Sequence, residues 1–265
     1  MFVATEDGRL YVQSAGSGEP LLLIHGWPLD HRVFGPQLEM LAEHFRVLAY
    51  DRRGFGRSTA PPGLDRELDD IDRILDAAGA PSAHLLGMSQ GGRIALRYAA
   101  TRPQRTRSLI LQGAAVDGLP TEGDDDVPVA EYAELVRAGR VDEVRARWLA
   151  HPMMQLGPGN EAAARLLTEI LEDYDGTDLQ HLAPGGYGFD KDVLASIAAH
   201  GIPTLVLTGG RETAARKRHA HVIAERIPNA VEITLEQSGH MSNLTEPARY
   251  NSSVIAFCRG IGERG

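Results

Sequence analysis

Ala83-His84-Leu85-Leu86-Gly87-Met88-Ser89-Gln90-Gly91-Gly92 is the stretch that decides the fold of this 265-residue chain. Its first four residues form a short apolar run, typical of a strand buried on both faces of a parallel sheet. The G-x-S-x-G pattern at 87–91 follows directly, and helical spacing follows the pattern. A strand-to-helix turn this tight imposes strained backbone angles on the serine, and a Cβ at either flanking glycine would strike a neighbouring element. The pattern therefore predicts an accessible Ser89 at a helix N-terminus, where unpaired N–H groups favour developing negative charge.

Four further apolar runs have the same character as the one before Ser89. They are Leu21 to His25, Phe45 to Tyr50, Ser108 to Leu111 and Thr204 to Leu207. The intervals between runs contain apolar residues at helical spacing: Phe34, Leu38 and Leu41; Leu64, Leu68, Ile71 and Leu75; Ile94 and Tyr98; Ala220, Ile223, Ala224 and Ile227. Alternation of strand and helix predicts right-handed crossover units, and therefore an α/β fold with a mostly parallel sheet.

Both ends of the expected sheet show a different pattern. The N-terminal residues alternate around Asp7-Gly8, which predicts an antiparallel hairpin. Its apolar residues are Phe2 and Ala4 on one arm, and Leu10 and Val12 on the other. Residues 231–235 alternate apolar and polar, as a half-exposed strand at a sheet edge does. A closing helix is expected after Pro247.

Residues 118–196 interrupt the alternation of strand and helix. They contain helical stripes and Gly/Pro loops but no convincing strand. The stripes are Tyr132, Leu135 and Val136; Val141, Val144 and Trp148; and Leu167, Ile170, Leu171 and Tyr174. We therefore expect a helical cap at 118–196, inserted into a core domain formed by residues 1–117 and 197–265. The run Asp124-Asp125-Asp126 is interpreted as a solvated loop rather than a metal site.

Composition limits the partners and the compartment. A net charge of −9, with only two lysines, lacks the basic surface that nucleic-acid binding requires. The single cysteine, Cys258, lies in an apolar helical stretch and is expected to be core in a reducing setting. The first residues do not resemble a signal peptide, and no apolar run reaches the length of a membrane span. We expect a cytoplasmic protein that binds neither nucleic acid nor membrane; whether it is a monomer or a homodimer stays open.

A serine hydroxyl is a weak nucleophile, so it needs a base beside it and an acid that orients the base. The chain has 10 histidines. His240 stands out because it lies in a short loop between the expected edge strand and the final helix. That loop falls at the carboxyl edge of the sheet, where Ser89 also lies and where open α/β sheets carry their ligand crevice. His240 is therefore the predicted general base.

The orienting acid should follow Ser89 and precede His240, at the end of a strand. Glu212 meets this condition, just beyond the run that ends at Leu207, and is our prediction. Asp117 is the alternative, because it lies in the loop after the run that ends at Leu111.

Acyl transfer also needs donors aimed at the oxyanion that forms on the carbonyl oxygen. In this architecture they are the backbone N–H of the residue after the nucleophile and one from the loop after an early strand. These amides belong to Gln90 and Trp27. We expect Trp148, Met153, Met154, Tyr187 and Phe189 either to line an acyl pocket or to pack the cap helices.

The chain resembles the α/β-hydrolase superfamily through four motifs in the family's order: His25-Gly26, Asp51 to Ser58, Gly87 to Gly92 and Gly239-His240. Its elbow and its 135–149 segment are similar to small esterases and enol-lactonases, and residues 25–29 and 50–56 to cofactor-free haloperoxidases and perhydrolases. The resemblance implies an eight-stranded sheet with an antiparallel second strand, a cap after the sixth strand, and a Ser-acid-His triad without cofactor. Family members commonly carry aspartate where this chain has Glu212. The nucleophilic serine argues against haloalkane dehalogenase and epoxide hydrolase activity.

These observations favour a serine hydrolase that cleaves a carboxylic ester or lactone through an acyl-enzyme. Neither a complete dinucleotide fingerprint nor a P-loop or His-Glu-x-x-His metal site is found, so we expect no cofactor and no metal. Two alternatives remain: the same triad acting as a C–C bond hydrolase or perhydrolase, and a binding protein in which the triad is idle.

Overall fold

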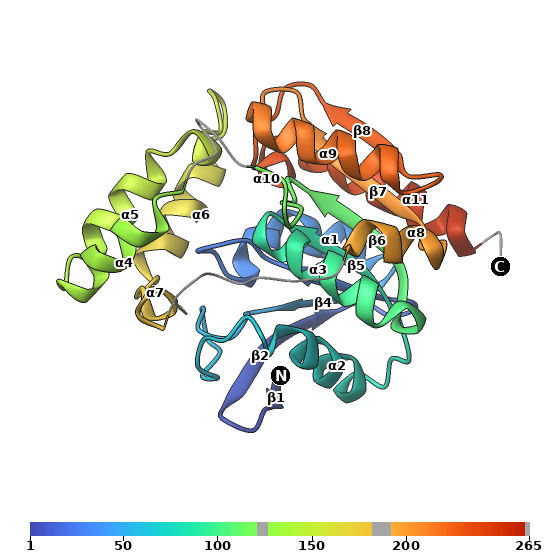
Figure 1. Ribbon diagram of the computed structural model, residues 1–265, viewed down its shortest axis with the longest axis horizontal. Coiled ribbons are helices and arrows are strands. Elements are labelled where there is room, and N and C mark those ends of the chain that lie inside the picture. Colours follow the sequence, from blue (N-terminus) through green and yellow to red (C-terminus); the bar gives the residue numbers. More distant parts are fainter. Residues whose placement is uncertain (121–126, 182–191, 263–265) are drawn as a thin grey trace.

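The computed structural model describes residues 1–120, 127–181 and 192–262. Eight strands form one sheet in the order β1-β2-β4-β3-β5-β6-β7-β8 (Figure 1). The strands are β1 (Phe2–Ala4), β2 (Arg9–Ala15), β3 (Pro20–Ile24), β4 (Arg46–Tyr50), β5 (Ala83–Met88), β6 (Thr106–Gln112), β7 (Thr204–Gly209) and β8 (Val231–Leu235). β2 runs antiparallel to β4, and β3 to β8 pair in parallel, so the predicted mostly parallel sheet with an antiparallel second strand is confirmed.

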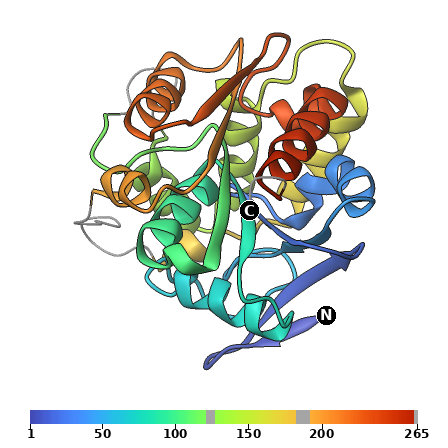
Figure 2. The same cartoon turned by 90° about the vertical axis from the view of Figure 1, so that its right-hand side faces the viewer.

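Helices cover both faces of the sheet. The helices that follow or precede its strands are α1 (Gly35–Ala42), α2 (Glu67–Ala77), α3 (Gln90–Thr101), α8 (Val193–Ala199), α9 (Ala214–Arg226), α10 (Ser242–Thr245) and α11 (Pro247–Gly262), with short 3-10 turns η1 (His31–Phe34) and η2 (Pro103–Arg105). Helices α1 and α11 pack together on one face, while α3, α8 and α9 lie on the other (Figure 2).

Alternate residues of each central strand enter two separate hydrophobic cores. In β3, Leu21 and Leu23 face the core that contains Val254 and Cys258 of α11. Leu22 and Ile24 face the opposite core under α2, α3 and α9. A strand buried on both faces must be apolar throughout, which explains why the central strands appear in the sequence as continuous apolar runs. Cys258 is fully buried, as predicted.

The N-terminal hairpin forms, but the inward face of its first arm differs from the expectation. Val3 is buried beside Leu10, whereas Phe2 and Ala4 point to solvent. With only 3 residues in β1, the period-2 pattern is too short to fix which face is inward. At the other edge of the sheet, β8 is the half-exposed strand that its alternation predicted.

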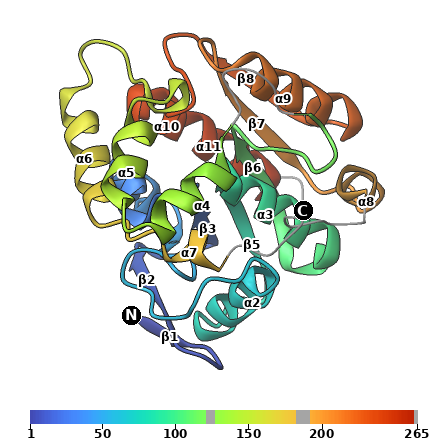
Figure 3. The same ribbon diagram turned by 60° about the vertical axis from the view of Figure 1, so that its left-hand side comes forward.

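Helices α4 (Val129–Arg137), α5 (Val141–Leu149), α6 (Glu161–Glu172) and α7 (Thr177–Gln180), with the turn η4 (Pro152–Met154), follow β6 and lie together to one side of the sheet (Figures 1 and 3). The three predicted helical stripes correspond to α4, α5 and α6. Helix α8 instead packs on α3, and Ser196 Oγ donates to the Ala100 carbonyl at 2.9 Å. Asp124-Asp125-Asp126, residues 184–186, Tyr187 and Phe189 lie outside the described residues. No described helix is long and apolar enough to cross a membrane.

Candidate active site

Ser89 occupies the turn between β5 and α3 with the strained backbone predicted for it. Its φ is 54° and its ψ is −116°, a region that non-glycine residues rarely adopt. A Cβ on Gly87 would lie 2.5 Å from the Gly91 carbonyl oxygen, and a Cβ on Gly91 would collide with the Ile24 carbonyl. The two glycines are therefore required by close backbone approach, and the half-buried Ser89 faces the carboxyl edge of the sheet.

Gln112, the last residue of β6, connects the Ser89 turn to the His240 loop. Its carbonyl accepts from the Ser89 N–H at 2.8 Å. Its side-chain Nε2 donates to the His240 carbonyl at 2.9 Å and to Asn243 Oδ1 at 3.0 Å. Because Gln112 is 1% exposed, these contacts are shielded from competing water. Residues 89 and 240 are thus held at one edge of the sheet by one buried residue, the first through its backbone carbonyl and the second through its side chain.

The structure brings His240 and Glu212 together. His240 Nδ1 lies 2.7 Å from Glu212 Oε2, and both side chains are buried. Asp117, the alternative acid, is bound instead by Arg97, whose Nε and Nη2 each donate to it at 2.8 Å. Among the candidate acids, the carboxylate that orients the imidazole is therefore Glu212.

Glu212 keeps its charge despite burial. Burial by itself would raise the pKa of this carboxyl, but its charge interaction and hydrogen bond with His240, and the hydrogen bond from the Thr213 amide, hold the pKa below the usual value. The Thr213 N–H donates to Glu212 Oε1 at 2.8 Å. An ionised carboxylate on Nδ1 fixes the imidazole with its proton on Nδ1, which leaves Nε2 as the basic nitrogen.

The loop after β3 lies directly against Ser89. A Cβ on Gly26 would be 3.1 Å from Ser89 Cβ and 3.7 Å from its Oγ. The Arg52 N–H donates to His25 Nε2 at 2.9 Å, so His25 carries its proton on Nδ1, which donates to the Gly26 carbonyl at 2.8 Å. Burial, reinforced by the charge of Arg52, lowers the pKa of His25 to about 3. A neutral His25 therefore fixes the backbone that leads to the Trp27 amide.

The second predicted oxyanion donor is the amide of Gln90. Gln90 is the first residue of α3, and first-turn N–H groups have no acceptor within their own helix. Its side-chain Oε1 accepts from Arg52 Nη1 at 2.7 Å. Arg52 in turn pairs with Glu67 at 2.8 Å, and both residues are buried.

A cavity of about 370 Å³ opens in front of Ser89 and Gln90. Its apolar wall includes Trp27, Phe55, Val129, Trp148, Met153 and Leu179. Trp148 and Met153 thus both line the cavity and belong to the buried core, whereas Met154 is buried but does not appear among the lining residues. Apolar walls with a few polar groups are typical of sites for small organic ligands.

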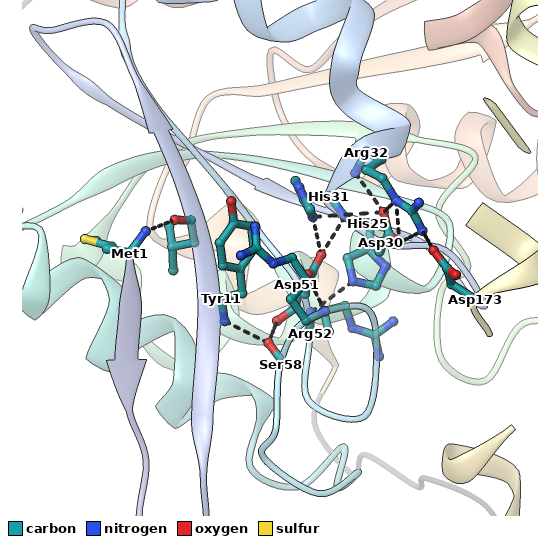
Figure 4. Close-up of polar contacts among 12 residues, drawn as sticks. Met1, Tyr11, His25, Asp30, His31, Arg32, Asp51, Arg52, Ser58 and Asp173 are labelled. Carbon is teal, nitrogen blue, oxygen red and sulfur yellow. Dashed lines mark hydrogen bonds and ion pairs between the residues drawn. The ribbon is translucent and has the colours of Figure 1, made fainter. Parts of the chain in front are cut away.

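The motif from Asp51 to Ser58 forms hydrogen bonds with the loop after β3 and with β2 (Figure 4). Asp51 Oδ1 accepts from the His31 amide at 2.8 Å and lies 2.6 Å from His31 Nδ1. Asp30, His31 and Asp51 bring ligand-type atoms within 4.8 Å of one another, but Asp30 is already bound by Arg32, with Nη2 at 2.6 Å. Because these atoms hold one another, the cluster serves to fix the loops rather than to offer a metal open positions.

Four further residues of the site were not assigned from the sequence. Gln112 ends an apolar strand with a buried polar side chain, which is a signal available in the sequence. Gly113 follows it with φ +54°, and a Cβ there would lie 2.5 Å from His240 Cε1. Arg93 falls one helical turn after Ser89 and lines the cavity. Asp178, on α7, also lines it, and nothing in the local sequence distinguishes this residue.

An eight-stranded sheet of this order, with a strained serine turn after β5, defines a hydrolase of the α/β type. A family model described as alpha/beta hydrolase fold matches residues 19–247, so the chain belongs to the α/β-hydrolase family. The resemblance drawn from the four motifs is thereby confirmed.

Comparisons with individual proteins agree with the family. The chain is 28% identical to the AB hydrolase superfamily protein YisY of Bacillus subtilis (strain 168), covering 97% of this chain and 98% of the relative. It is 26% identical to a pimeloyl-[acyl-carrier protein] methyl ester esterase of Aliivibrio fischeri (strain MJ11), covering 94% and 96%. The enol-lactonase from Burkholderia xenovorans LB400 has the same fold, with a TM-score of 0.81, 20% identity and coverage of 98% and 100%. The relative named as an esterase supports ester hydrolysis in general, and the enol-lactonase structure shows the shared fold.

Proposed function

We propose that this protein hydrolyses carboxylic esters or lactones with Ser89 as nucleophile, His240 as general base and Glu212 as orienting acid. The observation that carries the proposal is the 2.7 Å contact between His240 Nδ1 and Glu212 Oε2, at the sheet edge where the strained Ser89 lies. A buried carboxylate on Nδ1 makes Nε2 the proton acceptor, which is the role a serine nucleophile needs.

The reaction proceeds in two halves that balance in protons. Ser89 Oγ attacks the carbonyl carbon while its proton moves to His240 Nε2, and the same proton then passes to the departing alcohol. Water attacks the acyl-enzyme ester as His240 takes one of its protons, and the Ser89 oxygen receives that proton when the acid leaves. The net change is one ester and one water converted to an acid and an alcohol.

The tetrahedral oxyanion would be held by the amides of Trp27 and Gln90. The contact of the Gly26 backbone with Ser89 and the position of Gln90 at the start of α3 support this assignment. Loss of one such donor typically lowers the rate about a hundredfold to a thousandfold.

Helices α4 to α7 would act as the cap over this site, inserted between core segments 1–117 and 197–265. Trp148, Met153 and Leu179 from this segment supply part of the cavity wall. Because cap side chains contact the part of the substrate that lies beyond the reacting bond, they would select the acyl or alcohol group.

Labelling and turnover test the proposal together. A fluorophosphonate probe should label the wild type but not Ser89→Ala, and that substitution should lower ester turnover about a millionfold. Ser252→Ala, at an exposed serine on α11, is the matched control and should label and turn over like the wild type. Ester turnover by Ser89→Ala at the wild-type rate would overturn the assignment.

A substrate panel separates the alternatives that share this triad. Esters and lactones should be cleaved fastest; a dienoic diketone tests C–C hydrolysis, and acetate with peroxide tests perhydrolysis. If the wild type neither reacts with the probe nor turns over any member of the panel, the protein is an idle binding protein and the proposal is wrong.

A further inference from the structure

Positive charge dominates the polar lining of the cavity in front of Ser89. The charged lining residues are the basic Arg52, Arg53, Arg93 and Arg216 and the acidic Glu67 and Asp178. The protein as a whole carries a net charge of −9, so the concentration of arginines at this cavity runs against the overall balance. The partners of each arginine determine which of them can serve a ligand.

Two of these arginines are already committed to buried carboxylates. Arg52 Nε donates to Glu67 at 2.9 Å, and Arg53 Nε donates to Asp70 at 2.6 Å. Arg216 is a buried residue that also has partners in the protein. Arg52, Arg53 and Arg216 therefore form part of the cavity wall, and each of them already interacts with other groups of the protein.

Arg93 is differently placed. It lies one turn after Ser89 on α3, with its N–H bonded to the Ser89 carbonyl at 3.2 Å, so its side chain rises on the same side of the helix as the nucleophile. Its side chain is 31% exposed, which leaves it accessible from the cavity. Its Nε is buried without a hydrogen-bond partner among the described residues.

The only described carboxylate near Arg93 is shared. Arg93 Nε is 3.5 Å from Asp117 Oδ1, too long and poorly aligned to count as a hydrogen bond, while Arg97 holds both Asp117 oxygens at 2.8 Å. Burial lowers the pKa of Arg93; Asp117 opposes that shift, and the charges of Arg97 and Arg216 add to it. In the part of the chain that the structure describes, two guanidinium groups therefore share one carboxylate, and Arg93, which lines the cavity, has no hydrogen bond to it.

We propose that Arg93 binds a carboxylate carried by the ester itself, so that the substrates of this site are anionic esters. This inference rests on the proposed function, since it assigns the substrate class of the same cavity. A guanidinium presents a planar fork of N–H donors that matches a carboxylate, and such charge-assisted pairs are stronger than neutral hydrogen bonds. The apolar wall between Ser89 and the outer cavity would hold the few carbons that separate the reacting carbonyl from the anionic end.

Matched ester pairs test the inference directly. Monomethyl adipate and methyl hexanoate differ in a terminal carboxylate on the acyl side, and the acetate ester of 4-hydroxybutyrate and butyl acetate differ in one on the alcohol side. The wild type should show a kcat/KM about 10- to 100-fold higher for the charged member of one pair, mainly through a lower KM. The pair that shows the preference identifies the end of the ester that Arg93 binds.

Variants at position 93 assign the preference to this side chain. Arg93→Gln should lower kcat/KM for the charged ester of the preferred pair and so abolish the preference, whereas Arg93→Lys should retain part of it. Arg226→Gln, at an exposed arginine on α9 outside the cavity lining, controls for net charge and should keep the full preference. If the wild type cleaves neutral esters but favours no charged partner, or if Arg93→Gln retains the preference, this inference fails while the proposed function stands. If Ser89 is labelled by the fluorophosphonate probe but none of the four esters is turned over, this inference alone fails; if the probe does not label Ser89 and no ester or lactone of the panel is turned over, both are wrong.

Discussion

The indole Nε1 of Trp27 donates to Asp178 Oδ2 at 2.8 Å, across 151 residues of sequence. Trp27 belongs to the loop after β3 that contacts Ser89, and Asp178 belongs to α7. Tyr174 adds a second donor to the same carboxylate at 2.7 Å. Burial raises the pKa of Asp178, an effect that the hydrogen bonds from Tyr174 and Trp27 oppose. The helices beside the sheet and the loop that would supply an oxyanion amide are therefore joined through one half-buried carboxylate.

Asp178→Asn should weaken catalysis through this connection. An asparagine removes the charge and replaces one carboxylate oxygen by an amide nitrogen, so Tyr174 must accept instead of donating and the charge-assisted hydrogen bond from Trp27 is weakened. We expect kcat to fall about tenfold with KM nearly unchanged, because a misplaced oxyanion amide weakens transition-state binding more than substrate binding. Active-site titration with a burst substrate separates this effect from a loss of folded protein.

Tyr174→Phe is the matched variant for that experiment. It removes the other donor to Asp178 and leaves the Trp27 contact in place, so kcat should fall less than threefold. Equal losses in the two variants would show that Asp178 stabilises the α6–α7 region without positioning Trp27.

Glu212→Gln should lower kcat by about four orders of magnitude, the loss expected when an amide no longer fixes the imidazole tautomer. Glu212→Asp should be intermediate, since the shorter side chain keeps the charge but not the 2.7 Å contact. Asp117→Asn provides the comparison, because that carboxylate is bound by Arg97, and kcat for a neutral ester should fall less than tenfold. A larger loss from Asp117→Asn than from Glu212→Gln would contradict the assignment.

Gly113→Ala should inactivate the enzyme by steric contact with the imidazole. Its Cβ would lie 2.5 Å from His240 Cε1 and 2.7 Å from Nδ1, too close for the ring to keep its place beside Glu212. We expect kcat to fall at least a hundredfold. Its left-handed backbone, with φ +54°, would also cost about 1 to 2 kcal/mol of stability.

Gly139→Ala separates the steric effect from the backbone effect. Its φ is +74°, and a Cβ there would meet no atom within 4 Å. It should lose similar stability in urea unfolding and retain wild-type kcat. Loss of activity in both variants, or in neither, would refute the steric explanation.

The parts of the molecule that depend on contacts between residues close in the chain could be predicted from the sequence. The tight turn around Ser89 needs glycines at 87 and 91 because the backbone approaches closely there, so the G-x-S-x-G pattern alone predicts the turn. The mostly parallel sheet could be predicted because its central strands are buried on two faces and are therefore apolar throughout. His240 could be chosen because a loop after the last strand has only one edge of the sheet to occupy.

What the sequence left open depends on contacts between distant residues. Glu212 and Asp117 both follow a strand at the same edge, and they are distinguished by the contact of Glu212 with His240 and by the pairing of Asp117 with Arg97. Asp178 lies in a short helix far along the chain, and its position opposite Trp27 follows from packing of the whole helical segment. The expectation for the inward-facing residues of β1 was wrong because a strand of 3 residues is too short to define which face is buried.

His25 should make the stability of the protein depend on pH. Burial lowers its pKa in the folded state to about 3, against 6.5 for an ordinary histidine. Between these values the unfolded chain binds a proton that the folded chain excludes, so the free energy of unfolding falls as pH is lowered through 6.5 towards 3. This one group contributes up to about 1.4 kcal/mol per pH unit, and its contribution is fully present above pH 6.5. Urea unfolding between pH 7.5 and 5 measures the slope.

His25→Gln removes the titrating ring, so its slope should be shallower than that of the wild type even though its stability at pH 7.5 is lower. His200→Gln, at an exposed histidine, should keep the wild-type slope. Parallel slopes for the wild type and His25→Gln would show that the folded protein accepts a proton at His25, and that the loop carrying the Trp27 amide opens in mild acid.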